Sequence, residues 1–289
     1  MWEREFILTT IYTLISIVYT HSLLYPHIHT LSYILDVVLN ELWPLFLGLS
    51  SDAQDSVRLL SVEICLSFGD VTFFGPKFVE ESLLPVVLKL AGDRSWRVRY
   101  LVGASFTGLL ENVFIPISGG SSLDALTIFT TLLGDSEAEV RTASARQLAG
   151  SCAHFPQVDF EKKILPVLRA LSSDSSVSVR AAVATQLNPL SAIAGAELAA
   201  SALFPLYTHF FADESSQVRL NAVSKMDVVC QVMGIEKLSQ SILPAIIQLA
   251  EDKQVRQCCL NYKYLYLYIY TYLYLYIYTY LYTFVYTYT

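Results

Sequence analysis

The sequence contains one short phrase six times: an aspartate, a few further residues, then a valine followed by an arginine, recurring every 37 to 42 residues. In the first five copies the valine follows the aspartate by five positions. These copies begin at Asp52, Asp93, Asp135, Asp174 and Asp213, and a shortened sixth runs from Asp252 to Arg256. A fixed period of this length, with helical sequence between the copies, indicates helix pairs stacked in a solenoid. The expected fold class is therefore all-α, an alpha-solenoid of antiparallel helix pairs.

A proline follows the same period. It lies eight residues before the aspartate in five of the six copies, and Thr127 takes its place in the third. The prolines are Pro44, Pro85, Pro166, Pro205 and Pro244. In the fourth copy apolar residues recur at helical spacing around Pro166, and Ser175 or Ser176 can cap a second helix with one apolar face. We expect Pro166 to kink or tighten the first helix of its pair near the start.

The repeated aspartate and arginine suggest one shared role. In a solenoid, the loop between the two helices of one repeat lies beside the same loop of the next, so an aspartate can meet an arginine and form a ladder of charge-assisted hydrogen bonds. The ladder residues would be Asp52, Arg58, Asp93, Arg99, Asp135, Arg141, Asp174, Arg180, Asp213 and Arg219. The alternative is that each aspartate only caps a helix and each arginine is a surface charge. We expect exposed rungs that set the stacking register and contribute about 1 kcal/mol or less each.

Composition argues against several classes of function. The formal net charge is −7, and the chain lacks the clustered Lys and Arg that bind phosphates, so nucleic acid is not an expected partner. Cys65, Cys152 and Cys230 fall on second helices, where we expect free buried thiols in a reducing compartment. His154 and His209 stand alone, without a nucleophile motif, a phosphate-binding glycine loop or metal-ligand spacing. We therefore expect no enzyme activity, no cofactor and no metal.

The chain divides into three parts by composition. Residues 41–257 mix apolar helix formers with charges and form the predicted solenoid of five repeats plus a truncated sixth. Residues 1–40 are an apolar segment without the repeat, and residues 258–289 are a low-complexity tail in which a Tyr-rich octet recurs. Our hypothesis is that the tail is translated repetitive or intronic sequence. For residues 1–40 we consider the same origin, a targeting segment or a helical cap, because the apolar run is shorter than the roughly 20 residues that span a bilayer.

Several stretches carry a more specific resemblance. A proline, an aspartate eight residues later, and Val-Arg at positions thirteen and fourteen resemble the HEAT repeat signature. Residues 52–60, 93–100, 137–141 and 234–245 further resemble the scaffold (A) subunit of protein phosphatase 2A, within a similarity that covers about residues 41–257. The resemblance implies a HEAT-repeat alpha-solenoid that acts as a non-catalytic scaffold. In that family, regulatory subunits bind the loops of the earlier repeats and the catalytic subunit binds the last ones.

The resemblance also implies a binding site. Ser95, Trp96 and Arg97 match the family's loop that faces regulatory (B-type) subunits, and an exposed tryptophan beside an arginine is typical of a binding hot spot. The same ridge in the flanking copies carries Gln54, Asp55, Glu137 and Glu139. The alternative for Trp96 is that its side chain folds back and covers the core.

Departures from the family pattern limit what carries over. Thr127 replaces the repeat proline, residues 114–122 are irregular and glycine-rich, and the sixth copy stops before its second helix is complete. The pattern lacks the repeats that bind the catalytic subunit in that family, so we expect this chain to be part of a scaffold. The catalytic subunit would be a partner only if those repeats are present in the full protein. We expect a cytoplasmic location, with the nucleus as a second compartment, and no membrane. The alternative function is a membrane-anchored or transport-type helical-repeat adaptor.

Overall fold

The computed structural model describes residues 13, 36–69, 74–117 and 122–223 of the 289-residue chain. The sixth copy of the repeat, Cys230, Pro244, the tail 258–289 and most of residues 1–40 lie outside the described residues. The regular elements of the described part are helices, which confirms the all-α prediction. The chain forms two compact units, residues 1–168 and 169–289.

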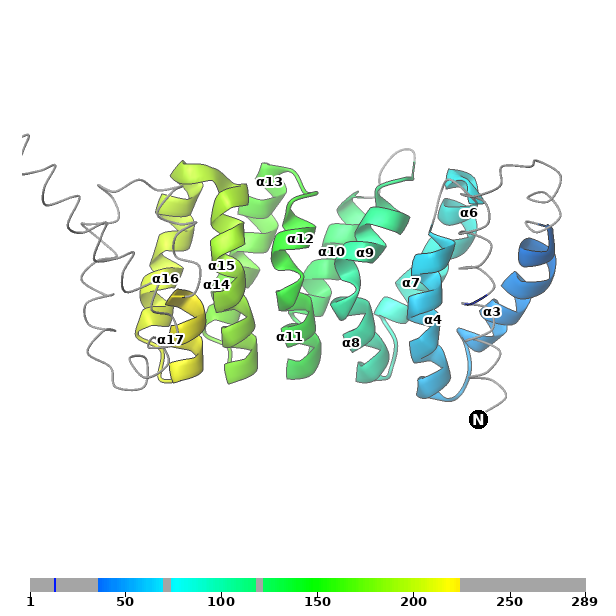
Figure 1. Ribbon diagram of the computed structural model, residues 1–289, viewed down its shortest axis with the longest axis horizontal. Coiled ribbons are helices and arrows are strands. Elements are labelled where there is room, and N and C mark those ends of the chain that lie inside the picture. Colours follow the sequence, from blue (N-terminus) through cyan, green and yellow to red (C-terminus); the bar gives the residue numbers. More distant parts are fainter. Residues whose placement is uncertain (1–12, 14–35, 70–73, 118–121, 224–289) are drawn as a thin grey trace, which may run out of the picture. The chain divides into compact units, whose positions relative to one another are not determined.

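The first unit contains three helix pairs and the start of a fourth (Figure 1). The first pair is η1 (Val38–Leu42) and α3 (Trp43–Leu49) with α4 (Asp55–Phe68). The second is α6 (Pro76–Phe78), η2 (Val79–Leu83) and α7 (Leu84–Ala91) with α8 (Trp96–Ala104), α9 (Phe106–Leu109) and η3 (Leu110–Phe114). The third is α10 (Ser122–Leu133) with α11 (Ala138–Arg146) and α12 (Leu148–Cys152). The next first helix comprises α13 (Gln157–Asp159), η4 (Phe160–Ile164) and α14 (Leu165–Ser172), which runs into the second unit.

The second unit continues the same arrangement. It contains α15 (Val177–Leu198), η5 (Ala199–Leu203), α16 (Phe204–Phe211) and α17 (Ser216–Val223). Gly195 ends the second helix of the fourth repeat within α15, because its φ of 78° and ψ of 167° are not helical. The two second helices α15 and α17 pack against each other. Helix pairs of one kind therefore build both units.

The first helices contain a wide turn that the sequence pattern did not predict. Each segment labelled η is one turn of π-helix, and those in first helices end two residues before a proline. A proline has no N–H, and its ring clashes with the carbonyl four residues back. In these helices the residue before the proline donates its N–H to the carbonyl five residues back, as Leu84 does to Val79. With Thr127 in place of the proline, α10 runs as an α-helix from Ser122 to Leu133. Pro166 was expected to kink or tighten the first helix near its start; the turn before it is widened rather than tightened, and the helical segment begins at Gln157.

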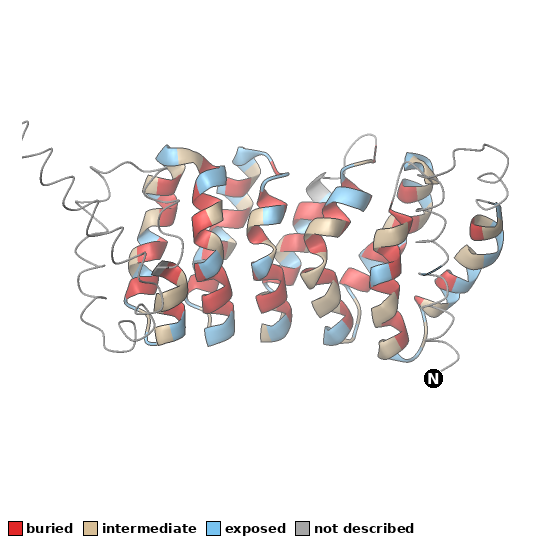
Figure 2. Cartoon of the chain, viewed as in Figure 1, coloured by how far each residue is buried: buried red, intermediate tan, exposed pale blue. Residues whose placement is uncertain are grey.

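The core lies between the paired helices and between neighbouring pairs. The valine of the repeated phrase is fully buried in all five described copies, at Val57, Val98, Val140, Val179 and Val218. Buried residues run along the helices, and exposed ones are common at the loops (Figure 2). The second helices α8 and α11 approach closely because Gly103 faces Ser144, whose Oγ would lie 2.4 Å from a Cβ at that position.

Cys65 and Cys152 are free and buried, as predicted, and burial raises the pKa of the Cys152 thiol to about 12.

One described stretch has the composition of a membrane span. Val177–Phe211 is long enough, with a mean hydropathy of 1.4 in its most apolar window. Gly195 breaks this stretch into two helices, and 44% of that window is buried within the protein. Core helices of soluble proteins meet the same length and hydropathy criterion, so this stretch is weak evidence for a membrane.

Replacing Gly195 with alanine should destabilise the protein. Its backbone lies in a region that is essentially restricted to glycine, and a Cβ there would meet no atom within 4 Å, so the cost is backbone strain of about 1 to 3 kcal/mol. Gly48→Ala is the matched control, because Gly48 also has nothing within 4 Å but lies inside helix α3, where alanine is favoured. Urea unfolding followed by circular dichroism should show a lower midpoint for Gly195→Ala and an equal or higher one for Gly48→Ala. Equal midpoints for Gly195→Ala and the parent chain would contradict the assignment.

Candidate protein-binding loop edge

The loops that join first and second helices share one local geometry. We call these five segments, residues 52–58, 93–99, 135–141, 174–180 and 213–219, the loop edge. In each, the aspartate Oδ1 accepts the backbone N–H two residues later; the donors are Gln54, Ser95, Glu137, Ser176 and Ser215, at 2.8 to 2.9 Å. In each, the arginine Nη1 donates to the carbonyl of its own aspartate; these are Arg58, Arg99, Arg141, Arg180 and Arg219, at 2.7 to 2.8 Å. The aspartate and arginine therefore fold their own loop before they contact another.

The arginine of one repeat also pairs with the aspartate of the next, and we call each such pair a rung. Arg58 donates from Nε and Nη2 to the two carboxylate oxygens of Asp93, at 2.7 and 2.8 Å. Arg99 contacts Asp135 in the same way at 2.7 and 2.9 Å. In the second unit, Arg180 contacts Asp213 at 2.8 and 3.1 Å. Arg141 and Asp174 belong to different units.

The rung side chains are largely covered, between 5% and 16% exposed, contrary to the exposed rungs expected from the sequence. The side chains of Arg58 and Asp93 are 5% and 9% exposed, and those of Arg180 and Asp213 are 8% and 5% exposed. The difference matters because breaking a buried ion pair leaves an uncompensated charge and costs about 3 to 5 kcal/mol. The rungs are therefore determinants of stability as well as of register.

The carboxylates of the rungs have lowered pKa values. Burial alone would raise the pKa of Asp93, but hydrogen bonds from Arg58 and from the Ser95 N–H, with the charge of Arg58, outweigh it. Asp135 and Asp213 show the same balance with Arg99 and Arg180. These aspartates are therefore held in the charged form.

Trp96 and Arg97 occupy the first two positions of helix α8. Trp96 is 40% exposed, and its ring lies edge-on to Tyr100 at a centroid distance of 6.4 Å. The guanidinium carbon of Arg97 lies 5.9 Å from the centroid of the Trp96 ring, within the range of a cation–π contact. Both side chains remain accessible, so an apolar plane and a positive charge are presented together.

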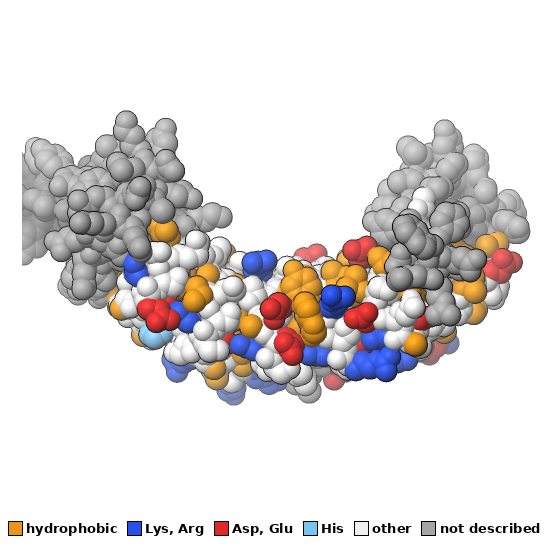
Figure 3. Space-filling view, turned by 90° about the horizontal axis from the view of Figure 1, so that it is seen from below, with side chains coloured by type: hydrophobic (Ala, Val, Ile, Leu, Met, Phe, Trp, Pro, Cys, Tyr) orange, Lys and Arg blue, Asp and Glu red, His pale blue; other side chains and the backbone are white. Residues whose placement is uncertain are grey.

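The other residues predicted for the site differ in accessibility. Gln54, Glu137 and Glu139 are exposed, whereas Asp55 and Ser95 are partly buried. The Ser95 hydroxyl donates to the Asp55 carboxylate at 2.9 Å, and this bond is the largest contribution to the lowered pKa of Asp55. In Figure 3, which views the molecule from below, hydrophobic side chains gather near the middle of the picture, with charged side chains of both signs beside them.

Sequence reasoning missed two features of this site: the bond from each arginine to its own loop carbonyl and the bond between Ser95 and Asp55. The signal for the first was present, because the arginine follows the aspartate by six residues in each described copy. Within the described ranges, no group of three or more His, Cys, Asp or Glu side chains could hold a metal ion. The arrangement is one of loops held by hydrogen bonds, with exposed side chains beside them.

Comparison with solved structures supports the fold of stacked helix pairs. The chain superposes on a Kap121p mutant with a TM-score of 0.53 at 15% identity, covering 77% of this chain and 22% of the other. An engineered protein gives a TM-score of 0.51 at 14% identity, covering 74% of this chain and 94% of the other. At this level of identity the similarity defines the fold.

Sequence comparison identifies the type of repeat. Residues 123–195 match the family described as PPP2R1A-like HEAT repeat. The chain is 41% identical over 75 residues to the regulatory A subunit of protein phosphatase PP2A from Schizosaccharomyces pombe, covering 26% of this chain and 12% of the relative. For the protein of the same name from Saccharomyces cerevisiae, identity is 38% over 68 residues, covering 22% of this chain and 10% of the relative. The middle of the chain thus consists of HEAT repeats similar to those of the PP2A regulatory A subunit, which confirms the predicted resemblance over a shorter range.

Removing one member of a rung should destabilise the protein strongly. Asp93→Ala would leave the buried Arg58 guanidinium without its carboxylate and should lower the free energy of unfolding by about 3 to 5 kcal/mol. Glu137→Ala, an exposed position on the next loop, should change it by less than about 0.5 kcal/mol. Urea titrations of the two variants measure both effects. A loss below about 1 kcal/mol for Asp93→Ala would show that the rung is dispensable.

The rungs should also make the protein sensitive to acid. The pKa values of Asp93, Asp135 and Asp213 are lower in the folded state than the unfolded value of about 3.9, so their contribution to stability is complete above about pH 4 and is lost as pH falls through the folded-state pKa values. Unfolding free energies measured from pH 7 to pH 2 should fall in the acid limb. Asp93→Asn should make that fall shallower, and an unchanged slope would refute a role for this carboxylate.

Proposed function

We propose that this chain is a non-catalytic scaffold resembling the PP2A regulatory A subunit and that its loop edge binds a regulatory (B-type) subunit of a phosphatase 2A complex. The observation that carries the proposal is the accessible Trp96–Arg97 pair on a loop held by buried rungs, in a chain whose repeats resemble that scaffold. Tryptophan and arginine are among the residues most enriched at binding hot spots.

The chemistry of the loop edge agrees with a binding role. The rungs place carboxylates and guanidinium groups where they neutralise each other, which leaves Trp96, Arg97, Gln54, Glu137 and Glu139 as side chains available to a partner. The apolar plane of Trp96 can supply contact area, and the charges around it can select the partner. Where later repeats of the family pattern are present, they would hold the catalytic subunit.

Trp96→Ala should weaken binding of a purified regulatory subunit by about 2 kcal/mol or more, which is roughly 30-fold in Kd, because hot-spot truncations have effects of this size. Val177→Ala is the matched control: Val177 occupies the same position of the fourth copy and is also 40% exposed. Surface plasmon resonance with the full chain measures both affinities, and circular dichroism and the melting temperature verify folding. A folded Trp96→Ala variant that melts earlier but binds with unchanged affinity would show that Trp96 only covers the core.

A further inference from the structure

We infer that the loop of the first repeat pre-organises Trp96 and Arg97, with Asp55 and Ser95 acting as positioning residues rather than as contacts. This inference rests on the proposed function, in which Trp96 and Arg97 meet the partner. It assigns the recognition site to two loops instead of one.

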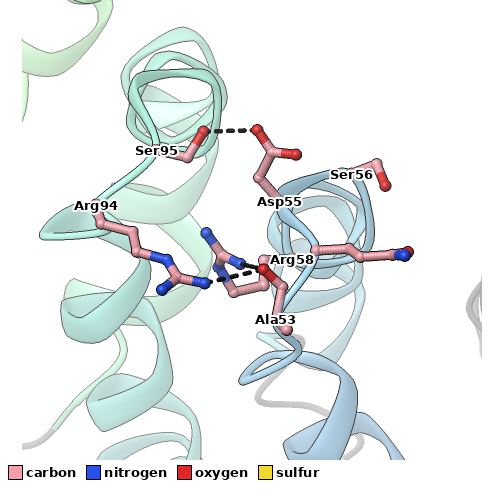
Figure 4. A pocket seen from close by; sticks show the side chains of 7 residues that line it. Ala53, Asp55, Ser56, Arg58, Arg94 and Ser95 are labelled. Atoms are coloured by element: carbon pink, nitrogen blue, oxygen red, sulfur yellow. Dashed lines mark hydrogen bonds between the residues drawn. The ribbon is translucent and has the colours of Figure 1, made fainter.

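The segment before Trp96 is fixed to the first repeat at three consecutive residues. Asp93 accepts the bidentate bond from Arg58. Arg94 donates from Nη2 to the carbonyl of Ala53 at 2.9 Å, and Ser95 donates from Oγ to Asp55 at 2.9 Å. Figure 4 shows Arg94 and Ser95 facing the first loop across an open hollow. Trp96 follows these three residues directly, so the start of its helix has little freedom to move.

Ser95 uses its hydroxyl in an unusual way for its position. It is the N-cap residue of α8, with φ −85° and ψ 123°, and a serine at an N-cap normally accepts a backbone N–H of its own helix. No such side-chain bond exists at Ser95, nor at Ser176, the N-cap of α15; the Ser95 hydroxyl donates instead to Asp55 of the preceding repeat. The Ser95 hydroxyl thus contributes a bond between repeats.

Asp55 also interacts electrostatically with Arg97, the residue that follows Trp96. The positive charge of Arg97 helps to lower the pKa of Asp55, after the larger effect of the Ser95 hydroxyl and against the effect of burial. The Arg97 guanidinium lies over the Trp96 ring. Asp55 therefore holds Ser95 before the tryptophan and attracts Arg97 after it.

Restraining the residues on both sides of Trp96 before a partner arrives favours binding, because less side-chain entropy is lost on association. The effect of Asp55 should then depend on Trp96 and Arg97. A direct contact would instead contribute to binding whether or not the tryptophan were present. This difference separates a positioning residue from a contact residue.

The first test needs no partner. The full chain is labelled with 5-fluorotryptophan, and the Trp96 resonance is assigned in the ¹⁹F NMR spectrum with Trp96→Phe. Asp55→Ala and Ser95→Ala should shift or broaden this resonance, and Ser95→Thr, which keeps the hydroxyl, should restore it. Ser176→Ala is the matched control, since Ser176 is the N-cap of α15 and its N–H makes the same bond to an aspartate. An unchanged Trp96 resonance in Asp55→Ala, or in Ser95→Ala if the Asp55 variant does not fold, would overturn the inference.

The second test is a double-mutant cycle with the regulatory subunit. Asp55→Ala should weaken binding by about 3- to 10-fold in the parent chain and should have almost no effect in the Trp96→Ala, Arg97→Ala background. The same loss in both backgrounds would identify Asp55 as a direct contact and would also overturn the inference. Unchanged binding of Trp96→Ala would defeat the proposed function alone, since the ¹⁹F measurement decides the positioning roles without the partner.

Discussion

The buried pairing of an arginine with the aspartate of the next repeat is the interaction on which the rest of this structure depends. Arg58, Arg99 and Arg180 each bind both their own loop carbonyl and the carboxylate of the next repeat, as Arg58 does with Asp52 and Asp93. The aspartate in turn fixes the backbone two residues further on, at the start of the second helix. One bond network therefore couples loop conformation, helix start and repeat spacing, and the site at Trp96 is built on it.

The repeat proline, where it is present, acts in the first helix of its helix pair. Because the π-turn adds a residue to one helical turn, the segment before the proline is rotated relative to an uninterrupted α-helix, by about 100° for one residue. Apolar residues on both sides of the turn are buried, including Val79 and Leu83 within η2 and Val86 and Val87 after it. The wide turn thus lets one first helix keep apolar contacts on both sides of its proline. Helix α10, with Thr127 in the proline slot, has its described residues in regular α-helix.

The fold could be predicted from the sequence because its signals are periodic. A repeated Asp and Val-Arg define where each helix pair turns, and stacking brings successive loops together, so the partners Arg58 and Asp93 follow from spacing alone. The burial of the rungs could not be derived in this way, because it depends on how neighbouring loops cover the side chains. The bond between Ser95 and Asp55 was also out of reach, since neither residue recurs at its position in every copy. Periodicity reveals what repeats share, whereas the features that make one loop a recognition site are those that differ.

The rungs have a direction, and this gives the array a polarity. In each described rung the arginine belongs to the earlier repeat and the aspartate to the later one. A repeat in such a series therefore offers its arginine to the repeat that follows and its aspartate to the repeat that precedes. Any repeat that carries both groups can form the same ion pairs with its neighbours. Loss of the whole segment between Asp93 and Asp135 would place the carboxylate of Asp135 where Arg58 now meets Asp93. Genetic gain or loss of complete repeats therefore preserves the arginine–aspartate pairs between neighbouring repeats. Loss of only part of a repeat, such as its aspartate loop, leaves the preceding arginine without a carboxylate.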